Sequence, residues 1–299
     1  MRIKPPFSYF GGKQLHVTRL LPYVPPHRFY AEVFGGAASL LFAKAPSEFE
    51  VYNDINSDLV NFFRVVRDLR KFKRLLKKLW LTPYSREEFT YCKENFATCK
   101  DPVERAYMWY VVQVMSFGGG GRKNPSFGFV VKSITRGMPQ RCATYLSCLE
   151  SLPYIHSRIM KVQIENLDFR RLFEIYISEW DYADSFAYLD PPYPLSTRKE
   201  KKYPYEMTEE DHAELVELLL KYSKNCKFML SGYPNPVYER LEKEGWQKIS
   251  WNIVCNAIGR IKGLKGKSLD KEEYRRQETI WVNYEISKDR TLFGGEQCW

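Results

Sequence analysis

The sequence predicts an α/β protein, in which a sheet is covered by helices on both faces and a helical block is inserted into the chain. Two observations support this fold class. Short apolar runs typical of buried strands alternate with helical patterns near both ends of the sequence. A helical stretch at residues 60–158 interrupts that alternation, and 299 residues are enough for one large domain with an insertion.

The elements before and within the interruption follow from their apolar spacing. They are expected, in chain order, at residues 28–34 (strand), 37–44 (helix), 49–54 (strand), 56–79, 85–97 and 101–116 (helices). The segment SFGGGGRKNPSFGF, residues 116–129, is expected to be a loop, because a helix does not tolerate a run of four glycines. A further helix is expected to end near residue 160.

After the insertion the alternation resumes. The expected elements are residues 161–165 (strand), 168–178 (helix), 185–190 (strand), a helix from residue 208, 226–231 (strand) and a closing antiparallel pair, 248–254 and 279–284. Pro191 and Pro192 end the strand at 185–190, because neither can donate a backbone hydrogen bond to a ladder. We therefore expect one domain formed by residues 1–59 and 159–299, and an inserted helical subdomain formed by residues 60–158.

The composition favours a polyanionic partner. The net charge is +10, which indicates nucleic acid first and an anionic membrane surface second. The sequence has no run of 18 apolar residues that could cross a bilayer, and its beginning lacks the apolar core of a signal peptide. The seven cysteines form no CxxC pair, so reduced thiols in a cytoplasmic protein are expected rather than a zinc site or a disulfide framework.

Three short motifs follow predicted strands, at the edge where open α/β sheets bind ligands. EVFGGAAS, residues 32–39, places glycines where the backbone can approach a ligand, although it is neither a GxGxxG nor a Walker motif. VYNDINSD ends the next strand with Asp54, where an acid commonly binds a ribose diol. AYLDPPYPLS, residues 187–196, is the third. Taken singly, the glycines could form a structural turn, Asp54 could cap a helix, and the third motif could be a strand followed by a turn.

Together the motifs resemble one family. FGGK at residues 10–13, a strand ending in FGG, NDINSDL, and DPPY after a long insert are similar, in residues and in order, to a DNA adenine methyltransferase of the Dam type. The resemblance covers nearly the whole chain. It implies a Rossmann-like sheet that binds S-adenosylmethionine, with residues 60–158 as a target-recognition subdomain.

The resemblance also assigns cofactor contacts by position. It implies that Tyr9 and Lys13 contact S-adenosylmethionine, that Phe34, Gly35 and Gly36 line its methionine side, that Asp54 holds its ribose hydroxyls, and that Asp168 and Phe169 lie at its adenine ring, with Asp190 beside the reacting end. The family's glycine turn often reads FxGxG, whereas this chain has Ala38 at the last glycine. That difference bears on how closely the backbone can approach the ligand there.

The DPPY motif has a chemical rationale. The exocyclic amino group of adenine is a poor nucleophile, because its lone pair is delocalised into the ring. The Asp190 carboxylate and the Pro191 carbonyl are expected to accept its two hydrogens, with Pro192 keeping the segment rigid, so that the lone pair faces the methyl donor. Tyr193 is expected to stack on the base, which must first leave the duplex. This chemistry needs no metal.

The glycine loop supplies the expected DNA contacts. Arg122, Lys123 and Asn124 follow four glycines, and arginine is the commonest reader of guanine in the major groove. The alternative is that these glycines merely join two helices and that Arg122 meets a phosphate. Double-stranded DNA inside the cell is the expected partner. The resemblance leaves open whether a cognate restriction enzyme is a second one.

Other functions remain open at this point. The same fold and motif also suit transfer to the amino group of cytosine, or to adenine in RNA, because each offers an sp² amine. A catalytically idle DNA-binding protein is a further alternative, against which the intact Lys13, Asp54 and Asp190 argue. A protein-amide methyltransferase is disfavoured, because that chemistry favours asparagine in place of Asp190.

Overall fold

The computed structural model describes residues 3–9, 16–121, 124–197, 204–254 and 275–286, and it confirms the α/β class. Its main sheet has the strand order β5-β2-β1-β6-β7-β9-β8. The strands from β5 to β7 are parallel, whereas β9 is antiparallel to both β7 and β8, as the predicted closing pair requires. Their bounds are β1 (Phe29–Glu32), β2 (Phe49–Asn53), β5 (Gln163–Glu165), β6 (Ser185–Leu189), β7 (Lys227–Gly232), β8 (Gln247–Val254) and β9 (Arg275–Val282).

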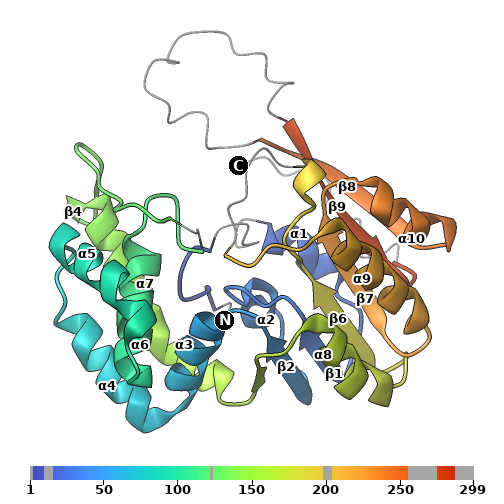
Figure 1. Cartoon of the computed structure of the whole chain (residues 1–299), viewed down its shortest axis with the longest axis horizontal. Coiled ribbons are helices and arrows are strands. Elements are labelled where there is room, and N and C mark those ends of the chain that lie inside the picture. Colours follow the sequence, from blue (N-terminus) through green and yellow to red (C-terminus); the bar gives the residue numbers. More distant parts are fainter. Residues whose placement is uncertain (1–2, 10–15, 122–123, 198–203, 255–274, 287–299) are drawn as a thin grey trace, which may run out of the picture.

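Helices cover both faces of this sheet. Tyr30, Tyr52 and Phe186 belong to a core shared with α1, α2, α3 and α7, while Phe29 and Phe228 belong to a second core shared with α8, α9 and α10. Figure 1 shows α3 to α7 gathered beside the sheet, on the side away from α8 to α10. The helices are α1 (Val17–Leu20), α2 (Ser39–Ala43), α3 (Ser57–Arg67), α4 (Leu69–Trp80), α5 (Arg86–Asn95), α6 (Pro102–Met115), α7 (Gln140–Ile159), α8 (Phe169–Ile175), α9 (Glu209–Lys221) and α10 (Glu239–Lys243).

Two expected helices differ from the structure. The continuous helix at residues 56–79 is wrong, because Asp68 adopts an extended backbone and separates α3 from α4. Its carboxylate accepts the backbone N–H groups of Arg70 and Lys71, at 2.9 and 3.0 Å, and so caps α4. The helix expected at residues 37–44 begins only at Ser39, because Ala38 is left-handed.

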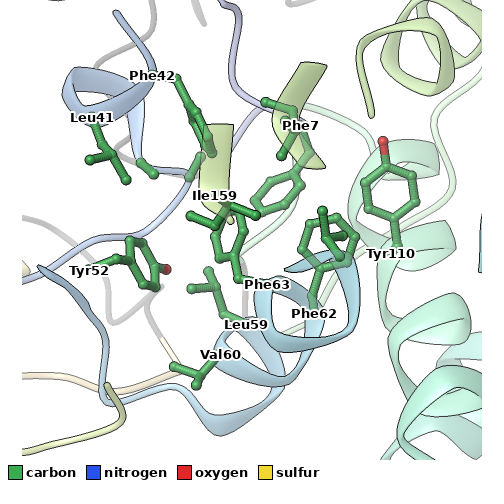
Figure 2. Packing of buried hydrophobic residues seen from close by; sticks show 14 of the residues in the cluster. Phe7, Leu41, Phe42, Tyr52, Leu59, Val60, Phe62, Phe63, Tyr110 and Ile159 are labelled. Atoms are coloured by element: carbon green, nitrogen blue, oxygen red, sulfur yellow. The ribbon is translucent and has the colours of Figure 1, made fainter. Parts of the chain in front are cut away.

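An aromatic cluster fixes the beginning of the chain against the helical block. Phe62 of α3 and Tyr110 of α6 stack with ring centroids 4.9 Å apart, and Phe7 meets Phe62 edge-on at 5.6 Å (Figure 2). The Tyr110 hydroxyl donates to the Pro6 carbonyl at 2.9 Å. The N-terminal segment therefore packs on α3 and α6, which sets the position of the next residues, Ser8 and Tyr9.

Buried charges tie the last helix of the block to the sheet. Glu50 of β2 accepts hydrogen bonds from Lys44, at 2.7 Å, and from Arg158 near the end of α7, at 2.8 Å. The three side chains are each less than a tenth exposed. Arg158 also donates to the Leu41 carbonyl of α2 at 3.2 Å. The end of α7 is thereby fixed to both β2 and α2.

Candidate active site

A cavity of about 440 Å³ lies at the carboxyl ends of the parallel strands. This is the edge at which open α/β sheets bind ligands, next to the point where the strand order reverses between β1 and β6. The cavity brings together nine of the residues that the sequence singled out, namely Tyr9, Phe34, Gly35, Gly36, Asp54, Asp168, Phe169, Asp190 and Pro192.

The lining residues follow the strand order along this edge. Phe169 comes after β5, Asp54 after β2, the glycine turn after β1, and Asp190 after β6. Adjacent strands lie about 4.8 Å apart. The lining residues therefore form a row that runs from Phe169, beside β5, to Asp190, beside β6.

Asp54 has a fixed carboxylate that joins two strand ends. One oxygen accepts the Gly36 N–H at 2.8 Å, and the other accepts the Asn56 N–H at 2.8 Å. Burial raises the pKa of Asp54, and the two backbone donors oppose that rise. Asp54 is not the cap of α3, because Asn56 itself accepts the N–H groups of Asp58 and Leu59.

Glu32, at the end of β1, is a cavity residue that the sequence reasoning missed. It is 2% exposed, and one of its carboxylate oxygens accepts both the Tyr30 hydroxyl at 2.9 Å and the Leu41 N–H at 2.8 Å. Burial raises the pKa of Glu32 to about 8, and the negative charge of Asp190 adds to the rise. The available signal was a charged residue inside the apolar run RFYAEVF.

The glycine turn after β1 is shaped by close contacts with Tyr52. A side chain on Gly35 would place its Cβ 2.2 Å from the Tyr52 ring, and the Tyr52 hydroxyl donates to the Gly36 carbonyl at 2.8 Å. Gly36 and Ala38 have φ values of 49° and 56°. Ala38 thus keeps the left-handed conformation that glycine adopts more readily.

The end of the cavity beside β5 carries two aromatic rings. The Phe34 and Phe169 rings lie 5.6 Å apart and both line the cavity. Asp168 caps α8 by accepting the Arg170 N–H at 2.9 Å, and it also pairs with the Arg170 guanidinium at 3.1 Å. Asp168 is therefore both a lining residue and a helix cap.

The DPPY motif divides between the cavity and the protein interior. Asp190 and Pro192 line the cavity, whereas Pro191 and Tyr193 are buried and are not among the lining residues. Tyr193 is 6% exposed, and its hydroxyl donates to Glu278 of β9 at 2.6 Å. A base that stacks on this ring must therefore displace part of what now covers it.

The expected DNA contacts are placed only in part. Arg122 and Lys123 lie outside the described residues, as does the cofactor contact Lys13. Asn124 is exposed and does not line the cavity.

Two glycines of the same loop, Gly120 and Gly121, are packed rather than open. Gly120 donates to the Ser8 carbonyl at 2.9 Å, and Gly121 donates to the Gln113 side chain at 2.6 Å. A Cβ on Gly121 would lie 2.7 Å from the ring of Tyr9. The glycines are therefore needed for packing against the N-terminal segment.

Two kinds of feature are absent from the residues that the structure describes. No group of three or more histidine, cysteine, aspartate or glutamate side chains there is arranged to hold a metal ion. None of the helices in the described ranges combines the length and apolar composition needed to cross a membrane.

Comparisons with known proteins agree over most of the chain. A family model described as D12 class N6 adenine-specific DNA methyltransferase matches residues 9–253. The Type II methyltransferase M1.LlaDCHI of Lactococcus lactis subsp. cremoris is 29% identical over 303 residues, covering 95% of this chain and 96% of the relative. The Type II methyltransferase M.MjaIII of Methanocaldococcus jannaschii is 27% identical, covering 95% of this chain and all of the relative. A DNA adenine methylase of Salmonella typhi is 28% identical over 120 residues, covering 39% of this chain and 42% of the relative.

Proposed function

Because the chain belongs to the D12 class N6 adenine-specific DNA methyltransferase family, it methylates adenine in DNA, and we propose that the strand-end cavity is its S-adenosylmethionine site. The observation that carries this proposal is the row of lining residues. Phe169 and Phe34 suit a purine ring, Asp54 suits the neighbouring ribose diol, and Asp190 suits a positively charged sulfonium. That is the order of these groups along S-adenosylmethionine.

The cavity also fits this molecule in size and in polarity. Its volume lies within the range of about 300–1,000 Å³ usual for small-molecule sites. Tyr9 lines the cavity beside Asn56, whose amide donates to the Tyr9 hydroxyl at 3.4 Å. We assign Tyr9 and Lys13 to cofactor contacts, Gly35 and Gly36 to the methionine part, and Asp168 with Phe169 to the adenine. Phe34, which the resemblance placed on the methionine side, is reassigned to the adenine, because its ring centroid lies 5.6 Å from that of Phe169.

The acceptor half of the site is proposed at the DPPY motif. When bound, S-adenosylmethionine supplies an electrophilic methyl group. The Asp190 carboxylate and the Pro191 carbonyl accept the two hydrogens of the target amine, which holds its nitrogen lone pair toward that methyl group. Tyr193 receives the ring of the extruded adenine.

DNA recognition is proposed for residues 60–158, with residues 1–59 and 159–299 as the catalytic domain. Arg122, Lys123 and Asn124 are the proposed contacts. The exposed rings of Phe117 and Phe129, at 47% and 59%, support an interface here, because each lies under an arginine, Arg141 and Arg86 respectively. We further propose that the enzyme acts on double-stranded DNA inside the cell, beside a restriction enzyme of the same site, as the Type II names of two relatives suggest.

The test is modified-base sequencing of DNA from cells that express the chain, together with kinetics of the purified Asp190→Ala variant. Methylated adenine at one short sequence is expected from the wild type. Asp190→Ala is expected to lose about 100-fold or more in rate. Asp184→Ala is the control, since Asp184 is a half-buried acid with one oxygen 3.6 Å from the Arg28 guanidinium and does not line the cavity. A near wild-type rate for Asp190→Ala contradicts the assignment.

A further inference from the structure

Glu278 is a buried acid outside the cavity that holds the aromatic ring of the DPPY motif. It lies on β9 and is 2% exposed. Its Oε1 accepts the Tyr193 hydroxyl at 2.6 Å. Hydrogen bonds between a hydroxyl and a carboxylate at this distance belong to the strong, charge-assisted kind. Taking a carboxylate out of water is costly unless such partners compensate it.

A second ring restrains Tyr193 from the side. Tyr233 meets it with ring centroids 4.4 Å apart and an interplanar angle of 65°. Tyr233 directly follows β7, whose last residue, Gly232, pairs with Thr279. Glu278 and Tyr233 thus come from adjoining positions on two hydrogen-bonded strands. Two neighbouring positions of the sheet therefore contact Tyr193, one at its hydroxyl and one at its ring.

The rest of the loop is anchored away from this ring. At its far end, Ser196 donates to Glu209 at the start of α9, at 2.9 Å, and accepts from Asn235 at 3.0 Å. At its near end, Asp190 follows β6 directly. Tyr193 lies between these anchors. The bond to Glu278 holds its hydroxyl, while the contact with Tyr233 restrains the ring from the side.

We propose that Glu278 is a positioning residue, which holds the Tyr193 ring in the plane needed to stack on the extruded adenine. This inference rests on the proposed function, since it requires that Tyr193 receives the base. It predicts that the bond affects the methyl-transfer step and leaves binding of S-adenosylmethionine unchanged. Glu278→Met keeps most of the volume and removes the acceptor, while Tyr193→Phe removes the donor from the other side.

The test is a double-mutant cycle measured by single-turnover methylation, with S-adenosylmethionine affinity from calorimetry. Each single variant is expected to lose about 10-fold in rate, and the double variant about the same 10-fold, because both changes remove one bond. The fluorescence of a duplex that carries 2-aminopurine at the target adenine is expected to differ from its value with the wild type, and to differ by the same amount with each single variant. The control pair is Glu165→Met and Tyr176→Phe, which break a similar bond of 2.7 Å outside the cavity and are expected to be fully active.

Losses that multiply to about 100-fold, unchanged emission, or full activity of either single variant overturn the inference. If Glu278→Met does not fold, Tyr193→Phe decides alone, through its rate and its emission. The proposed function fails separately. An inactive Asp190→Ala beside a fully active Glu278→Met contradicts only the role of Glu278, whereas an active Asp190→Ala contradicts the site itself.

Discussion

The strand-end cavity and the loop glycines Gly120 and Gly121 are held by contacts from different parts of the chain. In the cavity, Asp54 and Glu32 accept backbone N–H groups of the turns and helices next to the strands. Gly121 and Gly120 instead donate to the Gln113 side chain of α6 and to the Ser8 carbonyl of the N-terminal segment. The cavity is thus a property of the sheet, whereas the place of the loop depends on a segment that also lines the cavity.

The largest expected effect separates the two regions. Asp54→Ala removes the proposed acceptor for the ribose hydroxyls, so S-adenosylmethionine affinity is expected to fall by about 100-fold while DNA affinity stays the same. Calorimetry with the cofactor and a DNA titration measure the two. Asp54→Asn is the matched variant, because it keeps the shape and loses the charge, and it is expected to lose less. Unchanged cofactor affinity in Asp54→Ala contradicts the proposed pocket.

The converse prediction concerns the loop, where a substitution is expected to change DNA recognition and not cofactor binding. Arg122→Ala is expected to relax the choice of one base by about 1 to 3 kcal/mol and to leave cofactor affinity intact. Methylation of a library of single-base variants of the preferred site measures this, with Lys123→Ala as the comparison. A uniform loss across the library indicates a phosphate contact instead, and the reading role of Arg122 is then wrong.

A third variant is expected to affect both the loop and the cavity. Gly121→Ala places a Cβ against the Tyr9 ring, so it is expected to weaken both DNA binding and cofactor binding, each by about 10-fold. Gly245→Ala is the control, because Gly245 has a similar φ of 87° and open space around its Cα. Cofactor affinity that stays at the wild-type value in Gly121→Ala shows that loop and cavity act independently.

The cavity is also expected to respond to pH, through a buried acid. Because the folded-state pKa of Glu32 is about 8, the folded chain binds a proton that the unfolded chain releases above about 4.5. The contribution of Glu32 to stability is therefore fully present below about pH 4.5 and is lost as the pH rises through 8.

Glu32→Gln cannot lose this proton and keeps an oxygen for the Tyr30 and Leu41 donors. Its stability relative to the wild type is expected to increase with pH, by about 2 kcal/mol between pH 6.5 and pH 9. Urea denaturation at both values measures the difference. Parallel pH profiles for the two proteins contradict the raised pKa. The loop contacts of Gln113 and Ser8 are neutral, so Gln113→Ala is expected to leave the profile unchanged.

The smallest expected effect concerns the glycine turn. Ala38→Gly relieves a left-handed alanine but loses a buried methyl group and adds chain entropy to the unfolded state. These contributions nearly cancel, so the stability is expected to change by less than about 0.5 kcal/mol. Ala106→Gly, at a buried position of α6, is the comparison. It is expected to cost about 1 kcal/mol or more, because it loses the same methyl group and adds the same chain entropy to the unfolded state, with no left-handed alanine to relieve. Equal losses from the two variants mean that Ala38 is not strained.

The comparison also explains what the sequence predicted. Asp54, Gly36 and Asp190 were found because each follows a strand, and the ends of parallel strands meet at one edge whatever lies between them. The break at Asp68 was missed, because the helical spacing of apolar residues continues across it. Glu278 and Gln113 carry no local pattern. Their roles arise from partners that are distant in the sequence, which only the packed chain brings together.

The buried pair of Arg158 and Glu50 limits how new specificities can be engineered into this scaffold. Transplanting residues 60–158, the proposed recognition subdomain, from a relative replaces Arg158, while Glu50 and Lys44 stay with the recipient. A graft without an arginine at that place leaves the buried Glu50 carboxylate without one of its two cationic partners, at a cost of about 3 to 5 kcal/mol. Donor sequences for chimeric enzymes are therefore best chosen by this one inward-facing residue before any DNA-facing residue is considered.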